Sequence, residues 1–151
     1  MIARRSWHRW VFVAAGIYNI GWGISTALDP QWMYRLTGGA APDRAEMVSA
    51  LGLVIGLYGV LYLEVARAPE RGWLIAAVGL AGKVLGPVGL IYLVAAGSWP
   101  ASALWICVTN DFIWWAPFAL YLWDAWPAWR RAWHPTMEGD VTDGLTMEST
   151  G

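Results

Sequence analysis

Four apolar stretches, each about as long as a membrane is thick, constrain the fold of this 151-residue chain more than any other feature. A helix needs roughly 20 apolar residues to cross about 30 Å of hydrocarbon. The stretches run from about 10 to 28, 43 to 67, 73 to 96 and 99 to 123. Backbone polar groups inside lipid must pair within the protein, so each stretch is predicted to be helical. The sequence predicts an all-α fold, an antiparallel four-helix transmembrane bundle.

Composition favours a membrane protein over a soluble one. The chain is 58% hydrophobic and 14% charged and carries 13 Trp, which a water-soluble domain would struggle to keep off its surface. A net charge of -1 without a basic run argues against a nucleic acid partner. The lipid bilayer is the predicted partner. Cys107 has no second cysteine, so no disulfide framework is expected.

The spans use up most of the length, which leaves no room for a second globular domain. Residues 1–135 are predicted to form one transmembrane domain with flanking interfacial segments. Pro127 is expected to limit the segment that carries Trp126, Trp129 and Trp133 to a short helix lying along the membrane surface. Residues 136–151 are polar, acidic and rich in Gly and Thr, and we expect a disordered tail.

The connections carry helix start and stop signals. Asp29-Pro30 ends the first span, and because proline suits a first helical turn, residues 31–36 are predicted to form a short interfacial helix with Asp29 as its cap. Asp43 followed by Glu46 matches a capping box, in which each side chain pairs with a backbone N–H of the other residue. The second span is therefore predicted to start at Asp43.

Arginine placement predicts the orientation. Seven arginines flank the N-terminus, the connection between the second and third spans, and the end of the fourth: Arg4, Arg5, Arg9, Arg67, Arg71, Arg130 and Arg131. Only Arg35 and Arg44 belong to the other side. Because arginine-rich loops stay on the cytoplasmic side, we expect a multi-pass protein of a bacterial inner membrane with both termini cytoplasmic.

A cleavable signal peptide is the alternative interpretation of the first span. Arg4-Arg5 precede an apolar run that ends in small residues at Ser25-Thr26-Ala27. Tyr18, Asn19 and Trp22 interrupt that run, and cleavage would leave three spans. A retained first span is the favoured interpretation.

Glycines recur at helical spacing in the middle spans. Gly52, Gly56 and Gly59 lie along one side of the second span, and the third span carries Gly79, Gly82, Gly86 and Gly89. Small residues let helix backbones approach closely in lipid. Close helix packing is the predicted role of these glycines. Tyr18, Tyr58, Tyr62, Tyr92 and Tyr121 are predicted to be packing or membrane-interface residues instead of a cofactor site.

Two ionisable residues interrupt the last two spans. Lys83 and Asp111 each lie near the middle of an apolar stretch, where charges persist because they pair, face a cavity or do chemistry. Asn19 lies at a similar depth on the first span, and Asn110 adjoins Asp111. The sequence predicts a polar binding site at mid-depth formed by Asn19, Lys83, Asn110, Asp111, Trp114 and Trp115.

Prolines flank this cluster. Pro87 lies four residues after Lys83, so it removes the hydrogen bond that would end on the Lys83 carbonyl, and it is predicted to kink the third span. Pro117 acts in the same way in the fourth span. Paired kinks are a common way to open a polar pocket within a membrane protein.

Helical register leaves a direct ion pair open. Counted from the turn at 97–98, Lys83 lies deeper than Asp111 by an offset of ~4.5 Å at helical rise. Side chains also lean toward the N-terminus of their own helix, which turns the two groups apart on antiparallel helices. The ring face of Trp114 or Trp115 is therefore the alternative neighbour of Lys83.

Three segments carry a resemblance to known proteins: residues 82–87 (GKVLGP), 109–118 (TNDFIWWAPF) and 18–23 (YNIGWG). They resemble a group of small bacterial four-span membrane proteins whose function is not established, over nearly the whole chain except the tail. In overall plan the chain is also similar to the DoxX-like four-helix membrane proteins, some of which associate with quinone-linked oxidoreductases. That resemblance is one of topology, and it implies no role for any residue here.

Three functional classes follow from these observations. A mid-depth site that binds or moves a small ligand or a proton predicts a polar void around Lys83. An accessory or assembly subunit, docked to another membrane protein or to further copies of itself, predicts no void and an outward-facing charge. An enzyme acting on a lipid-soluble quinone or isoprenoid-like substrate, with Asp111 as acid or base, predicts an opening toward lipid.

The first class is favoured, with an anionic or lipid-soluble ligand. The sequence has no nucleophile–base pair, phosphate loop or set of metal ligands, and His8 and His134 lack further ligands beside them, so no cofactor or metal is predicted. A purely structural pair of Lys83 and Asp111 that fixes helix register is the remaining alternative.

Overall fold

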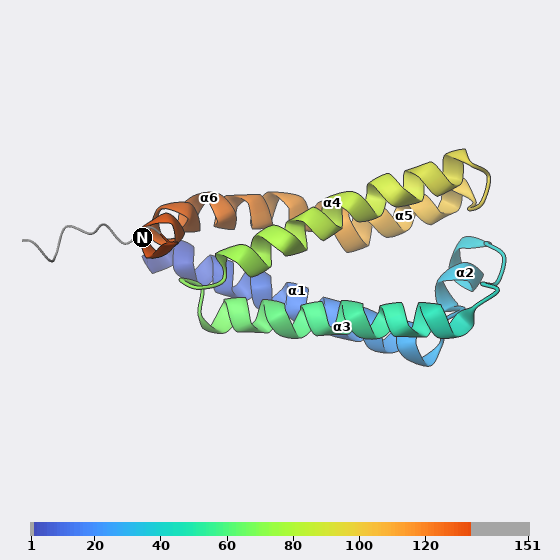
Figure 1. The fold of residues 1–151 in the computed structure, drawn as a ribbon, viewed down its shortest axis with the longest axis horizontal. Helices are drawn as coiled ribbons and strands as arrows, with labels where there is room; N and C mark the ends of the chain where they lie inside the picture. Colours follow the sequence, from blue (N-terminus) through green and yellow to red (C-terminus); the bar gives the residue numbers. More distant parts are fainter. Residues whose placement is uncertain (1, 134–151) are drawn as a thin grey trace, which may run out of the picture.

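The computed structural model describes residues 2–133, and almost all of them are helical (Figure 1). The elements in chain order are α1 (Ile2–Leu28), α2 (Trp32–Thr37), α3 (Ala45–Arg67), α4 (Trp73–Ala95), η1 (Ala101–Ala103), α5 (Leu104–Cys107), the π-helical turn η2 (Val108–Phe112) and α6 (Ile113–Trp133). The predicted all-α, antiparallel four-helix bundle is confirmed. The predicted tail at 136–151 lies outside the described residues.

Four helices in the described part of the chain are long and apolar enough to cross a membrane. They comprise Ser6–Leu28, Ala45–Arg67, Trp73–Ala95 and Ala101–Ala132, the last formed by η1, α5, η2 and α6 in succession. The chain is accordingly an integral, multi-pass membrane protein, as its composition predicts.

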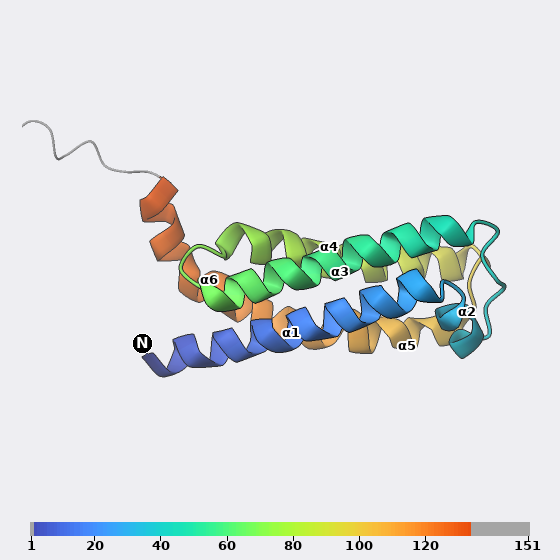
Figure 2. The same ribbon diagram turned by 90° about the horizontal axis from the view of Figure 1, so that it is seen from below.

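The four long helices form two pairs. Figure 1 shows α1 beside α3 in one layer and α4 beside α5 and α6 in the other, and Figure 2 shows the same bundle from below. Near the connection between α3 and α4 the two pairs meet around a largely aromatic core: Phe12, Ala15, Tyr62, Val65, Ala66, Ala76, Trp114, Phe118 and Tyr121. Toward the opposite end, α3 and α4 diverge (Figure 1).

Glycines bring α1 and α3 into backbone contact. A Cβ on Gly23 would lie 2.5 Å from the Gly56 nitrogen and 2.6 Å from the Gly52 carbonyl oxygen, and one on Gly59 would lie 2.7 Å from the Gly16 carbonyl oxygen. Neither helix could accept a larger residue there without moving apart. The packing role predicted for the glycines of the second span is confirmed, and Gly16 and Gly23 supply the opposing surface.

The glycines of α4 behave differently. Gly79 packs against the Tyr62 ring, and Gly86 lies beside the Asp111 carboxylate. A Cβ on Gly82 or Gly89 would meet nothing within 4 Å, so the predicted packing role is wrong for these two positions. The reason is the divergence of α4 from α3, which leaves part of its small-residue face uncovered.

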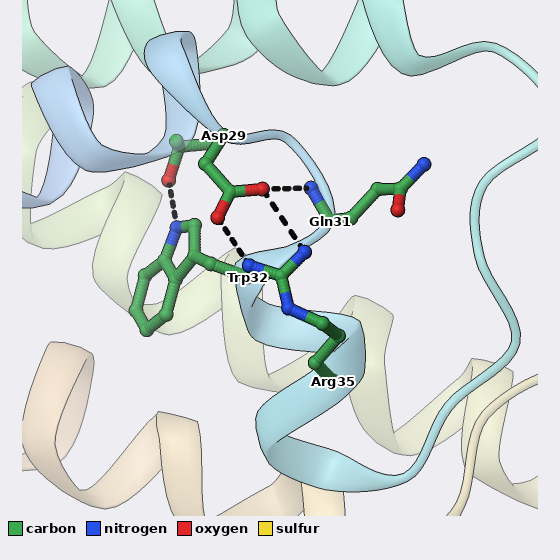
Figure 3. Close-up of polar contacts among 5 residues, drawn as sticks. Asp29, Gln31, Trp32 and Arg35 are labelled. Atoms are coloured by element: carbon green, nitrogen blue, oxygen red, sulfur yellow. Dashed lines mark hydrogen bonds and ion pairs between the residues drawn. The ribbon is translucent and has the colours of Figure 1, made fainter.

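The turn between α1 and α2 is held by a polar cluster (Figure 3). The Asp29 carboxylate accepts the Gln31 backbone N–H at 3.3 Å and pairs with Arg35, while the Trp32 indole donates to the Thr26 hydroxyl at 3.0 Å. The Arg35 guanidinium holds the pKa of the Asp29 carboxyl below its usual value. The predicted short helix after the first span is confirmed, although it starts at Trp32 and the Asp29 side chain caps the preceding turn.

Two sequence predictions about helix ends are wrong. No side chain caps α3, which begins at Ala45 after Arg44, so Asp43 stands one residue too far from the helix to form a capping box. Pro127 lies inside α6, which continues to Trp133 instead of ending before a separate short helix. Figure 2 shows this end of α6 turning away from the bundle, and packing of Trp73 on Trp129 at 4.4 Å supports the continued helix.

The close contact of α1 and α3 predicts opposite effects for two similar substitutions. Gly23→Ala places a methyl group against the α3 backbone and should lower the free energy of unfolding by about 1–3 kcal/mol, because backbone cannot yield as a side chain tip does. Gly21→Ala enters open space on the same helix, and its better helix propensity should leave stability unchanged or up to about 1 kcal/mol higher. Denaturant titration of the purified protein in micelles measures both. Equal effects of the two substitutions would contradict the contact.

The Asp29–Arg35 pair predicts a titration. Arg35→Gln should raise the pKa of the Asp29 carboxyl toward its ordinary value, because the hydrogen bond from Arg35 is the largest cause of the lowered pKa. The pKa of Asp29 is lower in the folded than in the unfolded protein, so the pair stabilises the turn at pH values above the unfolded pKa of ~3.9. This stabilisation is lost as the pH falls through the folded-state pKa. NMR titration of the carboxyl carbon measures the shift. Arg44→Gln at the same end is the control and should leave it unchanged.

Candidate functional site

Lys83 of α4 is buried against the last helix. Its exposed fraction is 5%, and that of Asp111 is 6%. The Lys83 ammonium donates to the Asn110 main-chain carbonyl at 2.6 Å, and it lies 4.0 Å from the Asp111 Oδ1 atom and 5.9 Å from the centre of the Trp114 ring. The two charges therefore meet, although the shortest bond of the ammonium goes to a carbonyl group.

A π-helical turn positions the acceptors. Asn110 and Asp111 lie in η2, where the chain departs from regular α-helix between α5 and α6. Turns of this kind loosen the backbone hydrogen-bond ladder and recur at functional sites. The Asn110 side-chain amide also donates to the Asp111 Oδ1 atom at 3.0 Å. Sequence reasoning missed this turn, because nothing in the local sequence marks a wider helical repeat.

The Lys83 carbonyl has its own partner on the last helix. Pro87 has no N–H to offer it, and the Trp115 indole N–H donates to this carbonyl at 3.0 Å instead. The predicted loss of a backbone bond is confirmed. The ammonium lies nearer to the Asp111 carboxylate than to the centre of the Trp114 ring, and Trp115 contacts Lys83 through its indole nitrogen, so the alternative of a tryptophan ring face as the nearer neighbour is wrong. Lys83 is thus tied to the last helix through both its side chain and its backbone.

A cavity of about 340 Å³ lies in front of this pair. It is lined by Asn19, Leu51, Val54, Ile55, Tyr58, Tyr62, Gly79, Gly82, Lys83, Gly86, Asn110 and Asp111. The four polar residues predicted at mid-depth therefore share one cavity. Trp114 and Trp115 do not line it. They contact Lys83 from the last helix, Trp114 through its ring and Trp115 through its indole N–H.

Sequence reasoning missed the α3 wall of the cavity. Tyr58 and Tyr62 line it one helical turn apart, and sequence reasoning had given both only a packing or interface role. Their spacing on the same face as Ile55 was the only available signal, and that pattern is equally typical of a buried apolar face. The Oδ1 atoms of Asn19 and Asn110 are buried and have no hydrogen-bond partner among the described residues.

The cavity opens sideways. Leu51 and Val54 of α3 line it, and 54% and 49% of their surfaces remain exposed. Its opposite wall is formed by the glycines of α4, in the region where α3 and α4 diverge (Figure 1). In a bilayer this rim faces hydrocarbon, because both helices are candidate spans.

The end of the bundle nearest the α3–α4 connection is filled by a cluster of tilted and edge-to-face aromatic rings. Phe12 packs on Phe118 at 4.6 Å and on Tyr121 at 4.8 Å, and Tyr62 meets Phe118 at 5.1 Å between ring centres. These residues are almost fully buried. No cluster of three or more His, Cys, Asp or Glu side chains among residues 2–133 is arranged to hold a metal ion.

The buried pair predicts non-additive substitutions. Lys83→Met leaves a buried carboxylate without its cation, and Asp111→Asn leaves a buried ammonium without its anion, so each should cost about 3 kcal/mol of unfolding free energy. The double variant should cost less than the sum by about 1–3 kcal/mol. Denaturant titration in micelles measures the cycle, with Val88→Met on the exposed face of α4 as control. Strictly additive losses would show that the two charges do not interact.

The bond to the Lys83 carbonyl predicts a rescue. Trp115→Phe should cost about 1 kcal/mol, because it leaves that carbonyl unpaired. In a Pro87→Ala background the restored backbone N–H can take the carbonyl, so the same substitution should cost clearly less. Trp105→Phe at an exposed position is the matched control. An undiminished cost in the alanine background would contradict the assigned bond.

No family model, curated protein or solved structure matches this chain. The conclusion that the chain is a four-span membrane protein therefore rests on the length and apolar character of its helices. The resemblance to DoxX-like proteins stays a prediction.

Proposed function

We propose that this protein binds a small, neutral, lipid-soluble molecule with a polar head, which enters the Lys83 cavity from the bilayer between α3 and α4. A single observation supports this most. One cavity joins a buried Lys83–Asp111 pair to a rim of lipid-exposed apolar side chains. Ligand sites typically combine apolar walls with a few convergent polar groups in this way.

The charges of the site favour a neutral ligand. Lys83 and Asp111 contribute one charge of each sign, so a ligand with a net charge would add an uncompensated ion to a poorly solvated site. An ammonium has three N–H donors, and within residues 2–133 one of them bonds to the Asn110 carbonyl, so an acceptor on the ligand has a partner. A donor on the ligand has partners in the Asp111 carboxylate and the Asn19 oxygen. Quinone-like and isoprenoid-alcohol heads meet these demands, and anions do so less well.

The aromatic cluster of Phe12, Phe118, Tyr121 and Tyr62 favours a binding function over the conduction of ions or polar solutes. A hydrated ion or polar solute crossing the membrane through the bundle would have to pass Phe12, Phe118 and Tyr121, which are packed and almost fully buried. Access from one side by way of the lipid needs no such passage. Movement of ions or protons is therefore the less supported form of the first functional class.

An enzyme acting on such a ligand is the second candidate, because the sideways opening is the feature that this class predicts. Asp111 lies in the cavity wall and would serve as the proton donor or acceptor toward a bound head group. The assembly-subunit class is less supported, because Lys83 and Asp111 are buried rather than turned outward.

The placement proposed for the chain is an inner membrane with both termini cytoplasmic. Arg9, Arg67, Arg71, Arg130 and Arg131 belong to the end of the bundle where α1 and α4 begin and α3 and α6 end. Arg35 and Arg44 belong to the opposite end. This asymmetry supports the orientation under the positive-inside rule.

Filling the cavity predicts loss of binding. Gly82→Leu adds a side chain to the cavity wall at a position with no atom within 4 Å of an added Cβ, so the fold should tolerate it. Farnesol and decylubiquinone should bind the wild type in lipid nanodiscs, and Gly82→Leu should weaken their binding at least about tenfold by removing the space they need. Microscale thermophoresis measures the affinity.

Gly89→Leu is the matched control. It makes the same change two turns further along α4, also in open space but outside the cavity, and it should bind as the wild type does. Oleate, a lipid-soluble anion, should bind more weakly than farnesol. Equal binding by both leucine variants, or preference for oleate, would contradict the proposal.

A further inference from the structure

A second cavity lies at the end of the bundle where α3 joins α4. Its volume is about 330 Å³, and it is separate from the Lys83 cavity. The polar side chains that line it come from four segments and belong to no site described above: His8, Arg9, Arg67, Glu70, Tyr121 and Asp124. It is called the arginine-end cavity below.

Its walls are fixed by bonds between segments. His8, which is almost fully buried, contacts the Asp124 carboxylate through its Nε2 atom at 2.9 Å and so joins α1 to α6. Arg9 donates from Nε to the Ala66 carbonyl at 3.0 Å, and Tyr121 donates to the Pro69 carbonyl at 2.5 Å. The cavity is therefore preformed, and a ligand would not have to order its walls.

The charges of the arginine-end cavity are mixed. Arg9 uses only Nε in its bond to Ala66, which leaves the terminal N–H groups of its fork for an acceptor. Arg67 is partly engaged by Glu64. Two carboxylates, Glu70 and Asp124, line the same space, and Asp124 is also bonded to His8. Two cationic and two anionic side chains within one small cavity suit an occupant that carries both signs of charge.

Its level in the membrane indicates where the occupant comes from. The candidate span in α1 begins at Ser6 and the one in α3 ends at Arg67, both beside this cavity. Trp73 packs with Trp126 and Trp129 at the same end, at 5.2 and 4.4 Å. Tryptophan clusters mark the headgroup layer of a bilayer. The cavity therefore opens among lipid headgroups.

We propose that the arginine-end cavity binds the headgroup of phosphatidylethanolamine. The phosphodiester accepts from Arg9 and Arg67, and the primary ammonium donates to Glu70 and Asp124. A phosphatidylglycerol headgroup has the phosphate but no cation, so it leaves the two carboxylates facing a like charge. A phosphatidylcholine headgroup has the cation but no N–H to donate.

Lipid retention by the full-length protein tests this. Native mass spectrometry of protein released from mixed micelles containing equal amounts of phosphatidylethanolamine, phosphatidylcholine and phosphatidylglycerol with identical acyl chains should show phosphatidylethanolamine retained in excess. Arg9→Gln and Glu70→Gln should each reduce that excess roughly threefold to tenfold, as the loss of one charge-assisted hydrogen bond at a partly exposed site allows. Glu70 belongs to an exposed connection, so its substitution should not disturb folding.

Arg71→Gln is the control, because it removes one arginine from the same connection without lining the cavity. It should leave the preference intact. Equal retention of the three lipids, preference for phosphatidylglycerol, or an unchanged preference in both Arg9→Gln and Glu70→Gln would overturn the proposal. Soluble glycerophosphoethanolamine that displaces the lipid at similar concentration would overturn the membrane source of the ligand.

Discussion

The Lys83 site depends on one energetically unfavourable feature, an ammonium group buried in the middle of an apolar helix. An ion at that depth persists only where other groups replace water around it. Among residues 2–133 this replacement comes from the last helix, through the Asn110 carbonyl, the Asp111 carboxylate and the face of Trp114. Those contacts hold α4 against α5, η2 and α6, while α3 diverges from α4 and leaves the polar groups with an open side.

The two helix pairs are held together by different physics. Between α1 and α3 the backbones touch at glycines, so dispersion along a tight seam supplies the attraction. Between α4 and the last helix, polar groups made available by Pro87 and by the π turn pair across the interface. The sequence therefore aligns both pairs residue by residue, the first through the steric fit of opposed glycines and the second through the bond from the Lys83 ammonium to the Asn110 carbonyl.

Much of this architecture could be predicted from the sequence, because hydrocarbon admits few solutions. The length of the apolar runs predicted the spans, and the isolated charges predicted which residues meet at mid-depth. Local rules failed where tertiary contacts outweighed them. Pro127 did not end a helix whose rings pack on Trp73, and the pattern at Asp43 and Glu46 formed no cap. The π turn has no signal in the local sequence. The spacing of Tyr58 and Tyr62 is equally typical of a packed face, and the Lys83–Pro87 spacing predicts a free carbonyl without naming Trp115 as its donor, so these features become visible only in the three-dimensional structure.

The aromatic cluster of Phe12, Phe118, Tyr121 and Tyr62 has a consequence for proton permeability across the membrane. Titratable groups midway across a bilayer can relay protons from one side to the other. Such leakage would dissipate the electrochemical gradient. Packed aromatic rings exclude the water chains along which protons hop. The packed rings thus separate the Lys83–Asp111 pair from the end of the bundle nearest the α3–α4 connection, so the pair can be held in the interior without a file of water leading to that end.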